Sequence, residues 1–240
     1  MQPGYSNLVK RIGFTTPLIG FYDAPDVSVF EPLVAPSPGK RACVFAFYKS
    51  WYSGKTLHLT RDNPGCKGCG TWIFDESNRT RQQYIEFLAD EEGLKASHEL
   101  MGKWLDVSRR YQPQHQDILI GPLKPNQYEY LKSVTFWVNP DQLSLLIIGA
   151  HYNNAPGDPT PVLAPFGSGC MELLPLFDDL DIPQSILGAT DIAMRSYLPP
   201  DMLAFTVTRS MFEQLCALDE NSFLYKRFLG DLKKARGLGS

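Results

Sequence analysis

The sequence predicts an α/β (or α+β) fold built on a mixed sheet, and two observations support this prediction. Segments with the apolar pattern of strands alternate along the chain with segments of helical periodicity. In addition, one order of elements occurs twice, in residues 17–70 and 133–170: strand, buried helix, strand, and a glycine-rich turn that carries cysteine. We therefore expect a single domain over residues 1–240, with two pseudo-repeated units, a helical insertion at 79–112 and C-terminal helices.

The first unit begins with the apolar run at residues 17–22, which is rich in strand-forming residues. Residues 42–52 are apolar on nearly every side, which indicates a buried helix, and Gly54 supplies its C-terminal stop. Residues 55–60 alternate with period two and therefore predict a strand. Residues 63–70, with the sequence NPGCKGCG, are expected to form a turn directly after that strand.

The second unit repeats this order. Residues 133–138 have the composition of a strand. Asn139 is a favourable N-cap for the following apolar segment, which predicts a buried helix over residues 141–152. A strand at 161–166 then leads into the glycine-rich turn at 167–170, followed by a helix of about two turns.

The insertion at residues 79–112 is polar, with apolar residues at helical spacing. It is expected to form two helices that lie across the sheet, with a break at Gly93. The last third of the chain is expected to hold two strands and two helices, at residues 185–188, 203–208, 210–218 and 222–236.

The composition excludes several classes of protein. Of the 240 residues, 20% are charged and the formal net charge is -3, so nucleic acid is not an expected partner. The most apolar run, residues 143–150, is far shorter than the roughly 20 residues that a membrane-spanning helix needs. The N-terminus lacks the basic and apolar regions of a secretory signal. We therefore expect a cytoplasmic protein without membrane association.

The NPGCKGCG segment carries two cysteines with two residues between them. Five cysteines in a chain of this length do not suggest a disulfide framework, which favours metal or redox chemistry. Gly65 and Gly68 allow the backbone to turn N–H groups toward sulfur, which stabilises thiolate charge and makes Cys66 and Cys69 candidate ligands. A plain turn with two ordinary thiols remains an alternative. A redox dithiol is another, although Gly70 makes a poor start for the helix that such a site needs.

The second glycine-rich turn is Gly167-Ser168-Gly169-Cys170. A thiol at a helix N-terminus has a lowered pKa, so the Cys170 thiolate is expected to be accessible near neutral pH. If the two units face one another, Cys43 completes a group of four cysteines suited to an iron–sulfur cluster or to a tetrahedral metal such as zinc. Cys43 and Cys170 can equally be small buried apolar residues, and Cys216, inside a predicted helix, is expected to be one.

Asp191 and Arg195 lie four residues apart, just after the predicted strand at 185–188. A structural ion pair is the simpler interpretation of this spacing. A ligand-binding pair is the alternative, because α/β proteins bind ligands beyond the ends of their strands.

Several stretches together resemble one family. They are RACVFAFY at 41–48, GKTLHLT at 54–60, GCKGCG at 65–70, VNPDQL at 138–143, APFGSGC at 164–170 and LPPDMLAFTV at 198–207. In this order, and over nearly the whole chain, they resemble the archaeal and bacterial family catalogued as domain of unknown function 169, also called the ArCR family. The family has no settled function, and its members are common in anaerobes.

The resemblance implies that Cys43, Cys66 and Cys170 fall in the family's characteristic motifs. Cys69 departs from the pattern, because glycine or alanine often stands at that place in the family. The resemblance therefore favours a cluster held by three cysteines with one open iron, or with a fourth ligand from elsewhere.

Three functions follow as expectations. The first is an iron–sulfur or thiolate-metal protein with a possible redox role and an electron-transfer partner, with Cys43, Cys66 and Cys170 as ligands. The second is a metal-free module whose glycine turns bind an anionic small molecule through backbone amides, at Gly65, Gly68, Gly167 and Gly169. The third is a thiol redox protein that uses Cys66 and Cys69.

Overall fold

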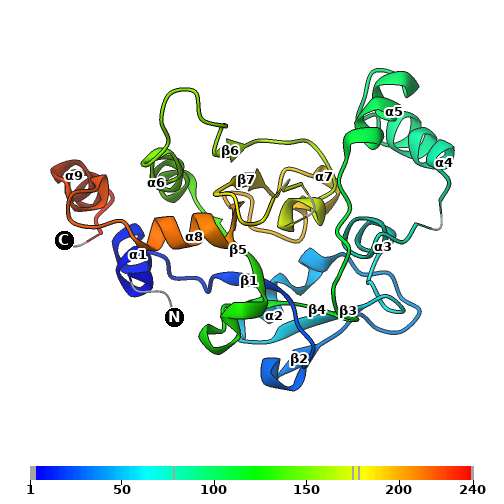
Figure 1. Cartoon of the computed structure of the whole chain (residues 1–240), viewed down its shortest axis with the longest axis horizontal. Coiled ribbons are helices and arrows are strands. Elements are labelled where there is room, and N and C mark those ends of the chain that lie inside the picture. The colour runs from blue at the N-terminus through cyan, green and yellow to red at the C-terminus, as the bar shows by residue number, and fades with distance from the viewer. Residues whose placement is uncertain (1–3, 78, 175, 178, 239–240) are drawn as a thin grey trace.

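A mixed eight-stranded sheet runs through the chain and confirms the predicted α/β class. The computed structural model describes residues 4–77, 79–174, 176–177 and 179–238 (Figure 1). The strands are β1 (Ile19–Asp23), β2 (Leu33–Val34), β3 (Thr56–Thr60), β4 (Asp117–Pro122), β5 (Leu131–Val138), β6 (Val162–Leu163), β7 (Ser185–Gly188) and β8 (Leu203–Thr208).

The strand order is β2-β3-β4-β1-β5-β8-β7-β6. From one edge to the centre the order is β2-β3-β4-β1, and from the other edge it is β6-β7-β8-β5. The two halves therefore have the same order when β1 to β4 are matched with β5 to β8. Each edge pair, β2 with β3 and β6 with β7, is parallel, and the inner pairs are antiparallel. The strand order therefore has an approximate twofold symmetry about the β1–β5 pair. Residue-by-residue correspondence between 17–70 and 133–170 stays a prediction.

The α-helices are α1 (Tyr5–Ile12), α2 (Tyr48–Tyr52), α3 (Lys67–Phe74), α4 (Arg81–Glu86), α5 (His98–Val107), α6 (Pro140–His151), α7 (Ile192–Arg195), α8 (Arg209–Cys216) and α9 (Arg227–Ala235). Segments of 3-10 helix are η1 (Ser28–Phe30), η2 (Val44–Phe47), η4 (Pro125–Tyr130), η5 (Met171–Leu173) and η6 (Phe223–Tyr225), and η3 (Phe87–Glu91) is a π-helical turn.

Two apolar cores lie on opposite faces of the sheet, because neighbouring residues of a strand point to opposite sides. Phe21 and Trp137 belong to one core, whereas their neighbours Tyr22 and Phe136 belong to the other. The first core is completed by side chains from η2, α2, α3 and η5, and the second by side chains from α1, α6, α8 and α9. Figure 1 shows the helices of the second core gathered at the left, away from α3.

Several predicted elements differ from the observed ones. Residues 42–52 form a 3-10 turn followed by the short helix α2 rather than one helix. The segment at 63–70, predicted as a turn, contains the first half of α3, and Cys66 caps its N-terminus by accepting the Cys69 N–H. The glycines at 68 and 70 are tolerated because six consecutive residues, 69–74, are buried in the first core, so packing outweighs their low helix propensity.

Elements of the second unit also differ from the predicted ones. Only β6 forms within the predicted strand at 161–166, and the helix after Cys170 is a single 3-10 turn, η5. Strand β4 was not predicted at all. In contrast, α6 begins as predicted, since Asn139 accepts the Gln142 N–H and Gln142 in turn accepts the Asn139 N–H.

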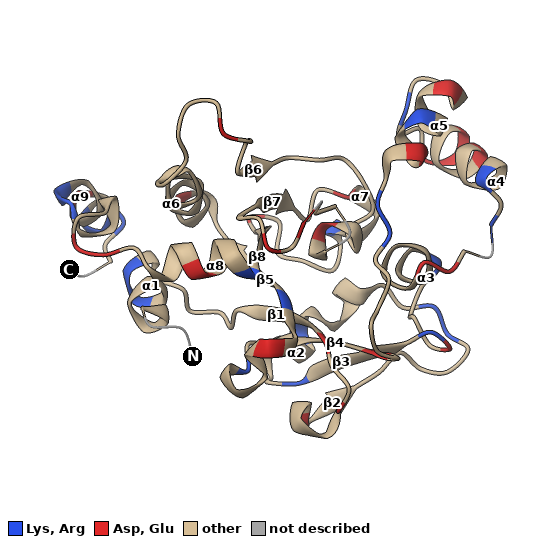
Figure 2. Cartoon of the chain, viewed as in Figure 1, with Lys and Arg blue, Asp and Glu red and all other residues tan. Residues whose placement is uncertain are grey.

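Two helices form in the insertion as predicted, but they do not lie across the sheet. They pack on each other through a small core of their own, made of Tyr84, Ile85, Leu88 and Met101. In Figure 1 they stand apart from the sheet, above α3, and Figure 2 shows acidic and basic residues interspersed along them. The insertion is therefore a cover for the α3 region.

At the C-terminal end, β7 and β8 agree with their predictions. The predicted helix 210–218 is α8, whose cap is Thr208, and the predicted helix 222–236 is divided into η6 and α9. Within the described residues, no helix is long and apolar enough to cross a membrane.

Candidate functional site

Four of the five cysteines meet at one cavity of about 300 Å³ on the face of the first core. Its walls come from the segment before η2, the start of α3, the turn before η5, the start of α7 and the underside of the insertion. The cavity is lined by Arg41, Cys43, Cys66, Lys67, Gly68, Cys69, Trp72, Arg79, Tyr84, Phe87, Leu88, Glu92, Ser168, Gly169, Cys170, Asp191, Ala193, Met194 and Tyr197. Segments more than 100 residues apart in sequence thus supply its thiols.

Cys66 is the N-cap of α3 and Cys69 lies in its first turn, after the loop 61–65 that follows β3. Their sulfur atoms are 3.5 Å apart, and the Cys69 backbone N–H donates to the Cys66 sulfur over 3.4 Å. Gly65, with a φ of 86°, turns its carbonyl oxygen to accept the Ala42 N–H over 2.9 Å. This bond ties the segment that carries Cys43 to the turn that carries Cys66.

Cys43 and Cys170 occupy corresponding places in the two halves of the sheet. Cys43 lies just before η2, in the connection from β2 to β3, and Cys170 lies just before η5, in the connection from β6 to β7. Cys170 is buried and Cys43 is partly exposed. A Cβ atom placed on Gly68 would lie 3.4 Å from the Cys170 sulfur and 3.7 Å from the Cys66 sulfur. The two sulfurs therefore approach the same point of the α3 backbone.

The pKa values of all four thiols are raised. Burial raises the pKa of Cys43 to about 11. The pKa of Cys66 rises because its S–H donates to Cys69 and because it is buried, and contact with Cys170 raises that of Cys69. At Cys170 the hydrogen bond from Cys69 acts to lower the pKa, but burial and the neighbouring thiols outweigh it.

The prediction that the Cys170 thiolate is accessible near neutral pH is therefore wrong. The helix that follows Cys170 has only three residues, so its dipole is too small to offset burial.

The other candidate residues are distributed over three places. Ser168, Gly169 and Asp191 line the thiol cavity, as does Gly68. Gly167 lines an adjoining apolar groove. Gly65 faces a polar cleft on the other side of Cys66.

The predicted pairing of Asp191 with Arg195 is replaced by separate partners. Asp191 accepts the backbone N–H groups of Gly169 and Ala193, over 3.0 and 2.9 Å. The Arg195 guanidinium instead donates to backbone carbonyls of the segment 189–202, at Ala189, Pro199, Pro200 and Met202. Arg195 thus anchors a loop, and Asp191 faces the cavity.

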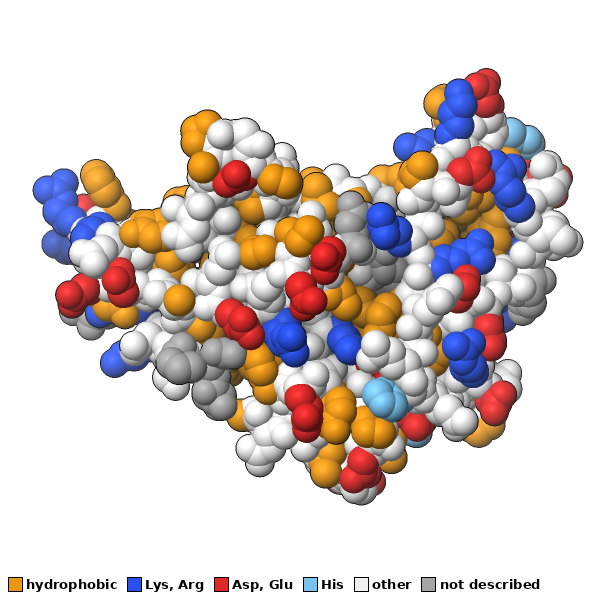
Figure 3. Space-filling model, in the orientation of Figure 1, with side chains coloured by type: hydrophobic (Ala, Val, Ile, Leu, Met, Phe, Trp, Pro, Cys, Tyr) orange, Lys and Arg blue, Asp and Glu red, His pale blue; other side chains and the backbone are white. Residues whose placement is uncertain are grey.

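Three cations of the cavity were not foreseen. Arg41, Lys67 and Arg79 line it, and within the described residues none of them forms an ion pair with a carboxylate. Arg79 stacks on Phe87, with its guanidinium carbon 3.8 Å from the ring centre. Figure 3 shows basic side chains on and beneath the insertion. Lys67 directly follows Cys66 in sequence, which is the signal that could have identified it.

The thiols are not arranged around a single point. Among the residues that the structure describes, no group of three or more His, Cys, Asp and Glu side chains is placed to hold one metal ion. The arrangement instead consists of Cys69 in contact with both Cys66 and Cys170, and of Cys43 on the same cavity wall.

Comparison with known proteins gives one match. The model of the family described as uncharacterised ArCR, domain of unknown function 169, matches residues 9–217. No curated protein and no solved structure matches the chain significantly.

Proposed function

The chain belongs to this uncharacterised family, and from its own side chains we propose that it binds an iron–sulfur cluster, or another metal centre held by thiolates, in the four-cysteine cavity. The ligands would be Cys43, Cys66 and Cys170, and Cys69 is the candidate for a fourth. The observation that supports the proposal is the meeting of four unbonded thiols at one cavity.

The donor set fits such a group. Two thiolates on one tetrahedral metal atom lie about 3.8 Å apart when each metal–sulfur bond is about 2.3 Å. The 3.5 Å between the Cys66 and Cys69 sulfurs is close to that separation. Cys43 and Cys170 lie on the same cavity, and a cluster of several metal atoms needs ligands spread more widely than one ion does. Because no three of these side chains are placed around one ion among the described residues, the set favours a cluster over one zinc ion.

The electrostatics support the same function. Four thiols with raised pKa values, two of them buried and two partly buried, are weak nucleophiles in the metal-free protein. A bound metal deprotonates its thiol ligands outright, so the same side chains become thiolates when the group is present. Arg41, Lys67 and Arg79 then offset the negative charge, and the Cys69 N–H stabilises the Cys66 sulfur.

The cavity supplies room for chemistry at such a centre. If Cys69 is not a ligand, one metal position opens toward the cavity lined by Tyr84, Asp191 and Tyr197. A bound cluster would supply electron transfer or activation of a small molecule at that position. An electron-transfer partner would then exchange electrons at the exposed side of the site.

The test is a measurement of iron, acid-labile sulfide and zinc on protein purified without oxygen, together with an absorption spectrum. We expect stoichiometric iron and sulfide in the parent protein and their loss in Cys43→Ser, Cys66→Ser and Cys170→Ser. Cys216→Ser is the matched control, because Cys216 is as buried as Cys170 but lies in the second core, across the sheet. A metal-free parent protein whose cysteine variants behave like Cys216→Ser would refute the proposal.

The second candidate is a Cys66–Cys69 dithiol, which is favoured by the 3.5 Å contact at the start of α3. The raised pKa of Cys66 opposes it, since the thiolate is the reactive form. Mass spectrometry after mild oxidation distinguishes the two. A reversible 66–69 disulfide in metal-free native protein supports the dithiol. The metal-free anion-binding module stays a prediction, supported by the three cations of the cavity.

A further inference from the structure

The helical part of the insertion, residues 79–107, is a small folded unit with a core of its own (Figure 1). Arg81 of α4 donates to the Asp106 carboxylate of α5, with both N–O distances 2.9 Å. His98 Nε2 of α5 lies 2.7 Å from the Asp90 carboxylate of η3. Within the described residues, each ion pair that this unit forms has both partners inside it. The unit can therefore move as one body and keep its own packing.

Ring contacts hold this unit against the rest of the protein. The Trp104 ring of α5 packs edge-on to Trp72 of α3, with the ring centres 5.8 Å apart. Its centre also lies 4.9 Å from that of Phe166, which precedes the turn of Cys170. The Lys95 ammonium lies 4.4 Å from the centre of the same Phe166 ring. Each such contact contributes about 1 kcal/mol, so together they form a weak attachment.

One hydrogen bond adds to these rings. The Tyr84 hydroxyl of α4 is bonded to the Thr71 hydroxyl of α3. The Thr71 hydroxyl also donates to the Lys67 carbonyl oxygen over 3.0 Å, so it keeps a partner when Tyr84 leaves. Separation of the unit from α3 therefore leaves no buried polar group of Thr71 without a partner.

Three cavities lie along the junction between this unit and the rest of the protein. The thiol cavity, of about 300 Å³, is bounded on this side by side chains from residues 79–92. An apolar groove of about 460 Å³ is lined by Leu94 on the unit and by Phe166 beyond it. A polar cleft of about 420 Å³ is lined by Asp106 on the unit and by Asp75 beyond it. Because protein cores contain few such voids, this junction is loosely packed and is not a continuous core.

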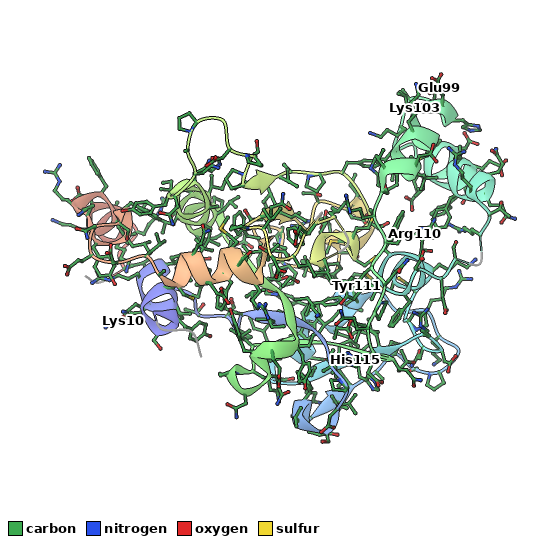
Figure 4. The ribbon with its side chains drawn as sticks, in the orientation of Figure 1. Lys10, Glu99, Lys103, Arg110, Tyr111 and His115 are labelled. Atoms are coloured by element: carbon green, nitrogen blue, oxygen red, sulfur yellow. The ribbon has the colours of Figure 1, made fainter. Side chains whose placement is uncertain are left out.

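The chain that returns from this unit is anchored at Tyr111. The Tyr111 N–H donates to the Trp72 carbonyl oxygen over 2.9 Å, and its hydroxyl donates to the buried Asp23 carboxylate over 2.6 Å. Residues 108–110 lie between α5 and this anchor, outside any helix or strand. Figure 4 labels Arg110 and Tyr111 on this segment, below α5. The unit can thus rotate about residues 108–110 while the sheet stays unchanged.

Two thiols of the cavity are closed off from solvent. Cys69 is 0% exposed and Cys170 is 5% exposed. Access to their sulfur atoms requires that a wall of the cavity move, and the insertion is the wall that has its own core and a loosely packed junction. We propose that residues 79–107 act as a lid, which rotates away from α3 and opens the thiol cavity. This inference goes beyond the proposed metal function and does not depend on it, because it concerns access to the thiols and not what they bind.

Labelling of the metal-free full chain with N-ethylmaleimide, followed for each cysteine by mass spectrometry, tests the lid. Cys216 is the internal reference, because it is 4% exposed but lies in the second core, across the sheet. Lid opening exposes less surface than unfolding and needs less free energy. Cys69 and Cys170 should therefore be labelled at least about tenfold faster than Cys216. Urea should accelerate their labelling less steeply than that of Cys216.

Two variants loosen the lid. Trp104→Ala removes both ring contacts and should accelerate the labelling of Cys69 and Cys170 by about tenfold or more, without a change at Cys216. Tyr84→Phe keeps the ring but loses the hydrogen bond to Thr71, and it should accelerate their labelling about three- to tenfold.

Lys103→Gln is the matched control. Lys103 precedes Trp104 on α5 and pairs with Glu99 inside the lid over 2.6 Å, so the variant should be labelled like the parent. It changes the outer surface of the lid and leaves the ring contacts in place.

Three results would overturn the proposal. The first is labelling of Cys69 and Cys170 at the rate of Cys216, with the same dependence on urea. The second is acceleration of all three cysteines by the same factor in Trp104→Ala, which would mean that the whole protein unfolds. The third is fast labelling of Cys69 and Cys170 that neither variant changes, because the cavity would then admit the reagent with the insertion in place.

The metal content of each protein, measured before the metal is removed for labelling, separates this proposal from the metal function. A metal-free parent whose labelling still depends on Trp104 would refute the metal function alone. Bound metal in a parent whose labelling follows Cys216 would refute the lid alone.

Discussion

The Gly169 backbone N–H donates to the Asp191 carboxylate over 3.0 Å, and this bond joins the turn that carries Cys170 to the start of α7. Both residues line the thiol cavity. The turn can approach Asp191 so closely because residue 169 has no side chain. A Cβ atom there would lie 2.7 Å from a ring carbon of Phe45 and 3.1 Å from Met194. The position of Cys170 thus depends on glycine at 169.

Gly169→Ala is therefore expected to destabilise the protein by about 1–3 kcal/mol, because the added methyl overpacks against buried Phe45. It should also reduce the amount of bound metal, since Cys170 is displaced. Urea unfolding and metal analysis measure the two effects. Gly230→Ala is the matched control, because a Cβ at residue 230, on α9, meets nothing within 4 Å. If the two variants are equally stable, the steric argument is wrong.

Asp23 fixes the segment that returns from the insertion to β4. Its carboxylate is fully buried and accepts hydrogen bonds from the Tyr111 hydroxyl at 2.6 Å, the Gln114 N–H at 2.7 Å and the His115 N–H at 2.9 Å. His115 Nδ1 is a further partner, at 2.8 Å. Tyr111 and His115 are labelled on this segment in Figure 4.

Asp23→Asn is expected to lower the free energy of unfolding by about 2–4 kcal/mol, because the amide NH₂ group cannot accept the bonds that a carboxylate oxygen accepts. Tyr111→Phe removes only one of these bonds and should cost about 1 kcal/mol. Chemical unfolding of the two variants measures the difference. Equal losses would mean that the hydroxyl, rather than the whole set of bonds, carries the stabilisation.

The local part of the fold could be predicted from the sequence, whereas its long-range part could not. Strands β3, β7 and β8 and the cap of α6 follow from patterns within a few residues. Strand β4 was missed, because its apolar residues 118–120 are buried on both faces and so do not alternate. The sheet order places β4 between β3 and β1, and nothing local to residues 117–122 encodes that position.

For the candidate site, too, the local features could be predicted from the sequence and the long-range ones could not. Cys66, Cys69 and Cys170 were identified by the glycine-rich turns around them, and Cys43 by its place at the start of a predicted helix. The meeting of the four cysteines depends on the arrangement of the sheet. The place of Glu92 in the cavity wall could not be predicted, because Glu92 reaches the cavity only when the insertion folds over α3. The start of α3 was missed because the burial of Trp72 and Phe74, which outweighs two glycines, is a tertiary effect.

Glu172 predicts how the stability of the metal-free protein depends on pH. Its carboxyl group is 1% exposed and accepts the Ala189 N–H at 2.5 Å and the Thr190 hydroxyl at 2.8 Å. Burial raises its pKa from 4.5 to about 7, although both hydrogen bonds lower it. The folded state therefore binds this proton more tightly than the unfolded state does.

The stabilisation from this proton is complete below pH 4.5 and is lost as the pH rises through about 7. The contribution of Glu172 to the free energy of unfolding should fall by about 3 kcal/mol between pH 4.5 and pH 8. Glu172→Gln should lack this part of the pH dependence. Urea unfolding of parent and variant at matched pH values measures it, and parallel curves for the two proteins would contradict the assignment.

Lys67 leads to a prediction about the redox behaviour of a bound centre. It follows Cys66, lines the thiol cavity and has no ion-pair partner within the described residues. Reduction adds one negative charge to a centre that already carries thiolates, so a nearby cation stabilises the reduced form.

Lys67→Gln is therefore expected to make the midpoint potential more negative while leaving the metal content unchanged, as measured by a redox titration followed by absorption. The shift should shrink at high ionic strength, because part of the interaction passes through solvent. Lys103→Gln is the matched control, since Lys103 pairs with Glu99 at 2.6 Å on the outer end of α5 (Figure 4). If both variants keep the parent potential at low salt, then Lys67 does not compensate the charge of the centre. The unpaired cations of the cavity would then serve an anionic ligand instead.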